Sequence, residues 1–182
     1  MSLKVTNLAV LVAGSLLFAA PVGAQVMVGG APMYATKTIA ENAPEAPNLT
    51  TLVAAVKAAG LVETLGSPGP FTVFAPTNRA FEKLPAGTVD TLVKPENKAM
   101  LTEILTYHVV PGTYSAEKLM AGARKKGGLT LTTVAGKPIT LKMSKGKLVV
   151  IDQKGGGAVV QTADVNQSNG VVHVIGSVLL PK

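Results

Sequence analysis

The chain has 182 residues, a length typical of a single domain. It contains no cysteine, which excludes both a disulfide framework and a lipid anchor on an N-terminal cysteine. Seventeen Lys and Arg residues against ten Asp and Glu residues give a formal net charge of +7, which favours anionic partners.

The N-terminal segment has the pattern of a secretory signal peptide. Lys4 provides a positive charge, residues 8–20 form a nearly continuous apolar run, and residues 22–24 are small. We expect residues 1–24 to be removed during export, which would place the mature protein in the periplasm or outside the cell. An uncleaved membrane anchor is the weaker alternative, because the apolar run is shorter than the ~20 residues that span a bilayer.

The segment that follows is rich in Gly, Ala and Pro. Residues 25–35 are predicted to be a flexible tail, since such residues at a chain end rarely order. A short helical turn near residues 37–42 is expected to begin the domain. The sequence therefore predicts one domain over residues 36–182.

Helix signals dominate the N-terminal half of this domain. Asn48 is predicted to cap an amphipathic helix that Gly60 ends, Pro95 to begin a longer helix, and Ser115 to cap a short helix that stops at Gly122. The predicted helices cover residues 37–42, 49–59, 61–65, 95–108 and 116–120, with a further helix after Thr77.

The C-terminal third alternates apolar and polar residues, as half-buried strands do. The predicted strands cover residues 129–134, 139–144, 147–151, 158–165 and 171–180. Helices gathered in the first half and antiparallel strands gathered in the second half predict an α+β fold.

The segment 72–81 predicts a strand that leads directly into a helix. Phe71 and Phe74 are expected to point into the core from a short strand, which Pro76 ends. Thr77 is a suitable N-cap for a helix that carries Phe81 inward.

Two histidines lie within apolar surroundings. His108 follows Tyr107 at the end of a predicted helix, and His173 lies within the apolar run of residues 169–181. We expect each to be a core histidine held by a hydrogen bond, because a buried polar group without a partner is costly.

In this order and spacing, residues 72–81, 107–110 and 169–181 resemble the signature stretches of the fasciclin (FAS1) domain, an extracellular adhesion and interaction module. The resemblance extends from about Met33 to Pro181, as a single copy. It implies two small, mostly antiparallel sheets packed as a wedge or sandwich, with helices along the N-terminal part and residues 171–180 as a central strand. It also implies that His108 is structural and that Tyr107 packs beside it.

No motif for catalysis or cofactor binding is present. The sequence lacks the Gly-x-Ser-x-Gly and Walker A patterns, and Gly155–Gly157 connects two predicted strands instead of opening a helix. Two histidines without cysteine leave little material for a metal site. We therefore expect no catalytic residue, cofactor or metal, and a protein that is not an enzyme. No aromatic residue lies within the lysine-rich stretch, so a nucleic-acid partner is not expected either.

A basic stretch is the candidate for binding an anionic partner. It contains eight cations and a single acidic residue, Asp152. The partners expected from this charge are an acidic polysaccharide, anionic lipid head groups or a cell-surface protein, and the loop at residues 82–94 is a second candidate surface. The alternative is that the lysines only keep exposed strands soluble. The cations are Arg124, Lys125, Lys126, Lys137, Lys142, Lys145, Lys147 and Lys154.

Two other functions remain open from the sequence. One is a carrier of a small apolar ligand in a cavity between the helices and the sheets, lined by Met100, Met120 and Met143, because methionine fits irregular apolar space. The other is a structural envelope protein that self-associates through exposed strand edges.

Overall fold

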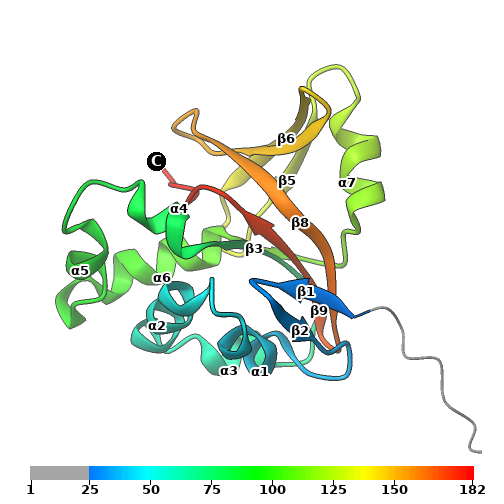
Figure 1. Ribbon diagram of the computed structural model, residues 1–182. Coiled ribbons are helices and arrows are strands. Elements are labelled where there is room, and N and C mark those ends of the chain that lie inside the picture. The colour runs from blue at the N-terminus through cyan, green and yellow to red at the C-terminus, as the bar shows by residue number, and fades with distance from the viewer. Residues whose placement is uncertain (1–24) are drawn as a thin grey trace, which may run out of the picture.

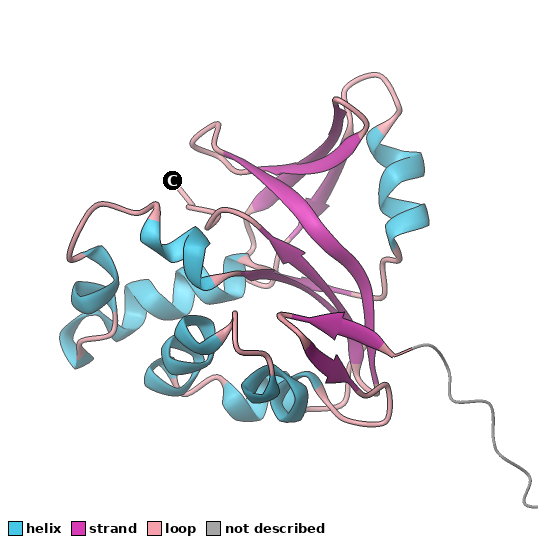
Figure 2. Ribbon diagram, viewed as in Figure 1, coloured by secondary structure: helices cyan, strands magenta, loops and turns pink. Residues whose placement is uncertain are grey.

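The computed structural model describes residues 25–182, and the signal peptide expected over residues 1–24 lies outside them. The described chain is an α+β fold, which confirms the predicted class, with most helices on one side of a twisted sheet (Figures 1 and 2). Within these residues no helix has the length and apolar character needed to cross a membrane.

The helices are α1 (Ile39–Asn42), η1 (Ala43–Glu45), α2 (Thr50–Ala59), α3 (Val62–Gly66), α4 (Asn78–Glu82), α5 (Thr88–Leu92), η2 (Pro95–Asn97), α6 (Lys98–Tyr107) and α7 (Ala116–Ala123). The strands are β1 (Val26–Val28), β2 (Ala31–Met33), β3 (Phe71–Pro76), β4 (Val109–Pro111), β5 (Leu129–Thr132), β6 (Pro138–Ser144), β7 (Lys147–Ile151), β8 (Gly157–Gln167) and β9 (Gly170–Ile175).

Seven strands form one sheet in the order β4-β3-β9-β8-β7-β6-β5, and β1 pairs with β2 separately. The long strand β8 joins two halves of this sheet. Residues 157–159 pair with β7, and residues 160–167 pair with β9 across two register shifts. The two small sheets that the resemblance implies are therefore two halves of one sheet that share β8.

The two edge strands of this sheet are short and lie against each other. β4 has three residues and β5 has four. Just beyond β5, the Val134 amide donates to the Val109 carbonyl at 2.8 Å. Short, mutually covered edges are one way in which proteins prevent edge-to-edge pairing. The architecture therefore gives little support to self-association through this sheet.

The central strands β3 and β9 are buried on both faces and separate two apolar cores. Val73 of β3 and Val172 of β9 belong to the core that the N-terminal helices cover. Phe74 lies one residue after Val73 and Ile175 lies three residues after Val172, so both point to the opposite face, and they belong to the core beneath α7. Because successive strand residues face opposite sides, two buried faces require a continuous apolar run. This explains the composition of both signature segments.

Asn169 connects three elements at the start of β9. Its Oδ1 accepts from the Ile39 amide at 3.0 Å, and its Nδ2 donates to the carbonyls of Leu65 and Ser67 at 2.7 and 2.9 Å. The side chain is almost fully buried. Nothing in the local sequence pattern predicts this structural role, because all three partners of the side chain lie far away along the chain.

Residues 25–35 are not a tail. They form the hairpin of β1 and β2, and its Val28 and Met33 side chains are buried in the core that the N-terminal helices cover. The prediction of a flexible segment was wrong because it weighed the glycines and prolines of the turn and not the apolar residues that flank it.

Three helix boundaries also differ from the prediction. Helix α2 begins at Thr50, and Asn48 makes no cap. Pro95 begins the short η2 helix, which leads into α6. Helix α7 continues through Gly122, where an added Cβ would lie 2.8 Å from a Leu129 side-chain carbon. Gly122 is therefore a position of close packing and not a helix stop.

We predict that Asn169→Ala lowers the free energy of unfolding by about 3 kcal/mol, because it leaves the Ile39 amide and two carbonyls without a partner in a buried site. The matched control is Asn166→Ala, at an exposed position of β8, which should change stability by less than about 0.5 kcal/mol. Chemical denaturation measures both. Equal stability of the two variants would contradict the assigned role.

Candidate functional site

The two signature segments lie side by side in the structure. β3 and β9 pair in parallel, with Phe71 opposite Gly170 and Pro76 opposite Ile175 (Figure 1). The Phe74 ring stacks on the His173 ring, with centroids 5.7 Å apart. Their residues therefore form the centre of the fold and not an exposed site.

The other residues of the first signature build the exit from β3. Phe71 is half-buried, whereas Phe74, Pro76 and Phe81 are buried. The Thr77 hydroxyl accepts from the Ala80 amide at 3.3 Å and caps α4. The segment brings aromatic side chains into both cores and turns the chain from strand to helix.

His108 lies in the core with both ring nitrogens hydrogen bonded. Nδ1 lies 2.7 Å from the Ile104 carbonyl, to which it donates, and Nε2 accepts from the Leu179 amide at 2.9 Å. These partners fix the Nδ1–H tautomer. Burial lowers the pKa of His108 to about 4, so the ring is neutral at pH 7.

His173 has the opposite arrangement. Nε2 donates to the Tyr114 carbonyl at 2.8 Å, and Nδ1 accepts from the Asp164 amide at 3.3 Å. Burial again lowers the pKa of the imidazole. In each ring one nitrogen donates and the other accepts, so neither histidine has a free nitrogen to offer to a metal or a substrate.

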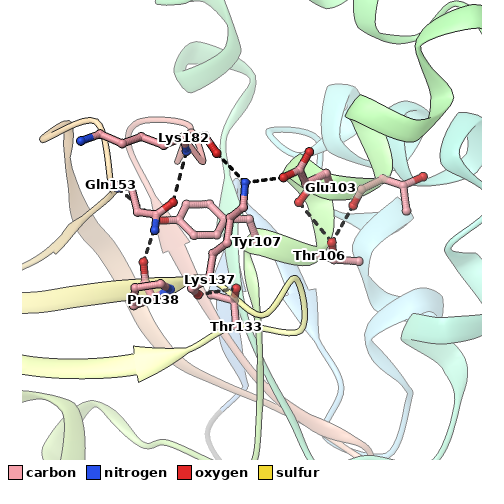
Figure 3. Close-up of polar contacts among 9 residues, drawn as sticks. Glu103, Thr106, Tyr107, Thr133, Lys137, Pro138, Gln153 and Lys182 are labelled. Carbon is pink, nitrogen blue, oxygen red and sulfur yellow. Dashed lines mark hydrogen bonds and ion pairs between the residues drawn. The ribbon is translucent and has the colours of Figure 1, made fainter.

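Tyr107 and Asp152 hold one end of the sheet together. The Tyr107 hydroxyl donates to the Pro138 carbonyl at 2.9 Å and accepts from the Gln153 amide at 3.1 Å (Figure 3). Burial raises the pKa of this hydroxyl, so it remains protonated and able to donate. Asp152 accepts from the amides of Lys154 and Gly156 with one oxygen and from that of Leu180 with the other. The β7–β8 turn and the C-terminal segment are thereby fixed to α6.

The eight cations of the basic stretch lie at opposite ends of the sheet. β6 pairs with β5 so that Thr132 faces Pro138, and with β7 so that Ser144 faces Lys147. The β5–β6 and β7–β8 turns therefore lie at one end, and the β6–β7 turn lies at the other. Lys137 and Lys154 belong to the first end, next to the C-terminus.

The remaining six cations form what we call the basic end: Arg124, Lys125, Lys126, Lys142, Lys145 and Lys147. The turn after α7 contacts β6, since an added Cβ at Gly128 would lie 2.8 Å from Lys142 Cγ. In Figure 1 this turn and the β6–β7 turn lie together beside the end of α7. All six residues are exposed, and none makes an ion pair or a side-chain hydrogen bond with another residue of the part that the structure describes.

Lys137 differs from the basic end in its charge environment. Its Nζ lies 2.5 Å from Glu103 Oε1 and also donates to the Lys182 carbonyl (Figure 3). Its charge is thus compensated within the protein. The sequence did not indicate this pairing, because Glu103 belongs to α6.

A groove of about 450 Å³ runs beside the basic end, between α7 and the strands β7 and β8. Lys147 and Gly146 lie at its rim, and Met120 and Val160 line it. It opens where β7 and β8 stop pairing, at the point where β8 passes from one half of the sheet to the other.

The loop at residues 82–94 is largely occupied with packing. It contains α5, whose Leu92 is buried, and Leu84 and Val89 are half-buried against the same core. Val93 is the one large apolar side chain of this loop that is exposed.

A family model, the sequences of related proteins and a solved structure all place this chain among fasciclin domains. The family model of the fasciclin domain matches residues 47–181. Protein sll1483 of Synechocystis sp. is 51% identical over 144 residues, covering 79% of this chain and 73% of that protein. Immunogenic protein MPB70 of Mycobacterium bovis is 40% identical over 148 residues, covering 79% of this chain and 68% of that protein. A solved FAS1 domain pair from the insect cell adhesion molecule Fasciclin I matches with a TM-score of 0.71 and 21% identity, covering 79% of this chain and about half, 51%, of that chain.

We predict that stability falls by about 3 kcal/mol between pH 6.5 and pH 4 through His108. In this range the unfolded imidazole binds a proton and the folded one does not, so acid favours unfolding, and the loss levels off below pH 4. His108→Gln keeps an acceptor for the Leu179 amide without a titrating group. Denaturant unfolding at several pH values should therefore show a shallower acid dependence for the variant than for the native protein. Parallel curves would exclude His108 as the cause.

Proposed function

Since the chain belongs to the fasciclin domain family, we propose that it is an exported adhesion module that binds an acidic polysaccharide through the basic end of its sheet. Six exposed cations carry this proposal: they come from the turn after α7, the β6–β7 turn and the adjoining strand β6, and none forms an ion pair within residues 25–182. No Asp or Glu occurs between Arg124 and Ile151 to reduce their field. The insect protein that shares this fold, Fasciclin I, is a cell adhesion molecule.

The chemistry of the basic end favours a polysaccharide over a membrane. Surface-bound membrane segments combine cations with large apolar side chains that enter the lipid. The two turns of the basic end instead place glycine next to their cations, with Gly127 and Gly128 after Lys126 and Gly146 between Lys145 and Lys147. Such turns can approach a polymer closely but have nothing to insert into a bilayer.

The same residues argue against a tight protein interface at this end. The dominant residues of protein interfaces are Trp, Tyr and Arg in desolvated pockets. The basic end has one arginine and no aromatic residue. Mobile lysines suit a partner with repeated negative charges, where several weak contacts form at once.

Export is the second part of the proposal. We expect protein recovered from the periplasm or the medium to begin at Gln25, because residues 22–24 have the small side chains of a cleavage site. N-terminal sequencing or intact-mass measurement checks this. Cell-associated protein that retains residues 1–24 would instead indicate the uncleaved anchor.

The binding test uses two triple variants of equal charge. Arg124→Gln, Lys145→Gln and Lys147→Gln remove three charges from the basic end. Lys94→Gln, Lys98→Gln and Lys154→Gln remove three exposed charges elsewhere. We expect the first variant to bind polygalacturonate about tenfold more weakly and with less salt dependence, since three exposed ion pairs of ~0.5 kcal/mol each are lost. The second variant should bind as the native protein does.

Equal loss in both variants would show that only net charge matters and that the basic end is not a site. Salt-insensitive binding would exclude charge as its cause. Binding to phosphatidylglycerol vesicles but not to the polysaccharide would replace the proposed partner with a lipid surface.

A further inference from the structure

A second site candidate lies in the other core, away from the basic end. A cavity of about 110 Å³ separates the N-terminal helices from the face of the sheet that they cover. Its walls come from the β1–β2 hairpin, from α1, α2 and α3, and from β3, β8 and β9 (Figure 2 shows these helices against the sheet). Representative lining residues are Val28, Leu52, Val56, Leu61, Phe71 and Val172.

The polar residues in the walls away from the opening already have protein partners. Asn42 Nδ2 donates to the Tyr34 carbonyl at 2.7 Å and to Gln167 Oε1, and both nitrogens of His108 are engaged as described above. The Thr106 hydroxyl donates to the Thr102 carbonyl at 2.8 Å. These groups therefore need no hydrogen-bond partner from a ligand. Whatever enters the cavity must therefore present hydrocarbon to its interior.

The volume limits the size of that hydrocarbon. Drug-sized ligands occupy pockets of ~300–1,000 Å³, whereas an engineered apolar cavity of ~150 Å³ stays dry and binds benzene. A cavity of about 110 Å³ is close to the second case. It would hold roughly six carbon atoms, by comparison with benzene, and it is too small for a full lipid chain.

The cavity reaches the surface between α2 and α3. Lys57, Val62 and Thr64 line it and are exposed. Lys57 is the only charged residue in the lining, and its Nζ makes no ion pair or hydrogen bond within residues 25–182. Long charged side chains place their stem along apolar surface and their head group in water, so this ammonium lies at the opening.

We propose that this cavity binds the alkyl chain of a small free carboxylate of about six to eight carbons, with the carboxylate at the opening beside Lys57. The apolar walls, the volume and the single uncompensated charge all select this class of ligand. The methionines expected to line such a site do not do so: Met100 is exposed, and Met120 and Met143 pack against the other core. The inference is independent of the polysaccharide proposal, because none of its residues belongs to the basic end.

A chain-length series measured by calorimetry tests the size of the site. From butanoate to hexanoate to octanoate, each added methylene should tighten binding about fourfold while it is buried. The gain should stop once the cavity is full, so that decanoate binds no better than octanoate. Affinity that rises steadily through dodecanoate would indicate surface adsorption and overturn the proposal.

Two further comparisons locate the ligand. Lys57→Met should weaken octanoate binding about twofold to fivefold and leave 1-octanol binding unchanged, because only the charge is lost. Lys98→Met is the matched control, since Lys98 lies near Gly60 at the end of the same helix but does not line the cavity. Equal effects of the two substitutions would exclude a role for Lys57.

The cavity itself is tested by filling it from two walls, with Val56→Phe on α2 and Ala40→Leu on α1. Each variant is first checked for native circular dichroism and cooperative unfolding. Either one, if folded, should lose octanoate binding, whereas Val93→Phe, at an exposed position outside the cavity, should retain it. Undiminished binding in a folded filled variant would overturn the assignment.

Discussion

The parallel pairing of β3 with β9 is the constraint on which the remaining structure depends. It joins two segments that are far apart in sequence, and both strands must be apolar on both faces because each face covers a separate core. The N-terminal helices are needed to cover one face, and α7 with the outer half of the sheet is needed to cover the other. Since neither core is closed without this pair, the two signature segments are best understood as architecture and not as a binding site.

Buried polar groups around this pair fix the position of the flanking segments. His108 holds the chain after β9 through the Leu179 amide, and His173 holds the Tyr114 carbonyl before α7. Asn169 connects the start of β9 to α1 and to the end of α3. An apolar side chain would fill the same space, but only a hydrogen-bonding group also selects one orientation for its neighbours. The neutral state of the histidines is part of this role, because a charged ring at either position would require a new partner in a dry core.

The sequence predicted those features whose cause is local. Thr77 and Ser115 cap helices as expected, since their hydroxyls reach amides three residues ahead. The predicted start of α2 was wrong because the group that caps this helix is distant in sequence. The Thr51 amide donates to Asn78 Oδ1 at 3.0 Å, and Asn78 is the first residue of α4, after β3. Gly122 was misread as a helix stop for a similar reason, because the leucine that requires its lack of a side chain lies on the following strand. Partners brought together by tertiary packing leave no signal in a single sequence.

The same limit governs the candidate site. The eight cations lie within one stretch of sequence, residues 124–154, but antiparallel pairing sends alternate turns to opposite ends of the sheet, so only six remain together. β6 has seven residues, which separates these ends by about 20 Å. This distance exceeds the Debye length of ~8 Å at physiological ionic strength. Lys154 therefore adds little to the field at the basic end, and a compact anion would meet only one group of charges.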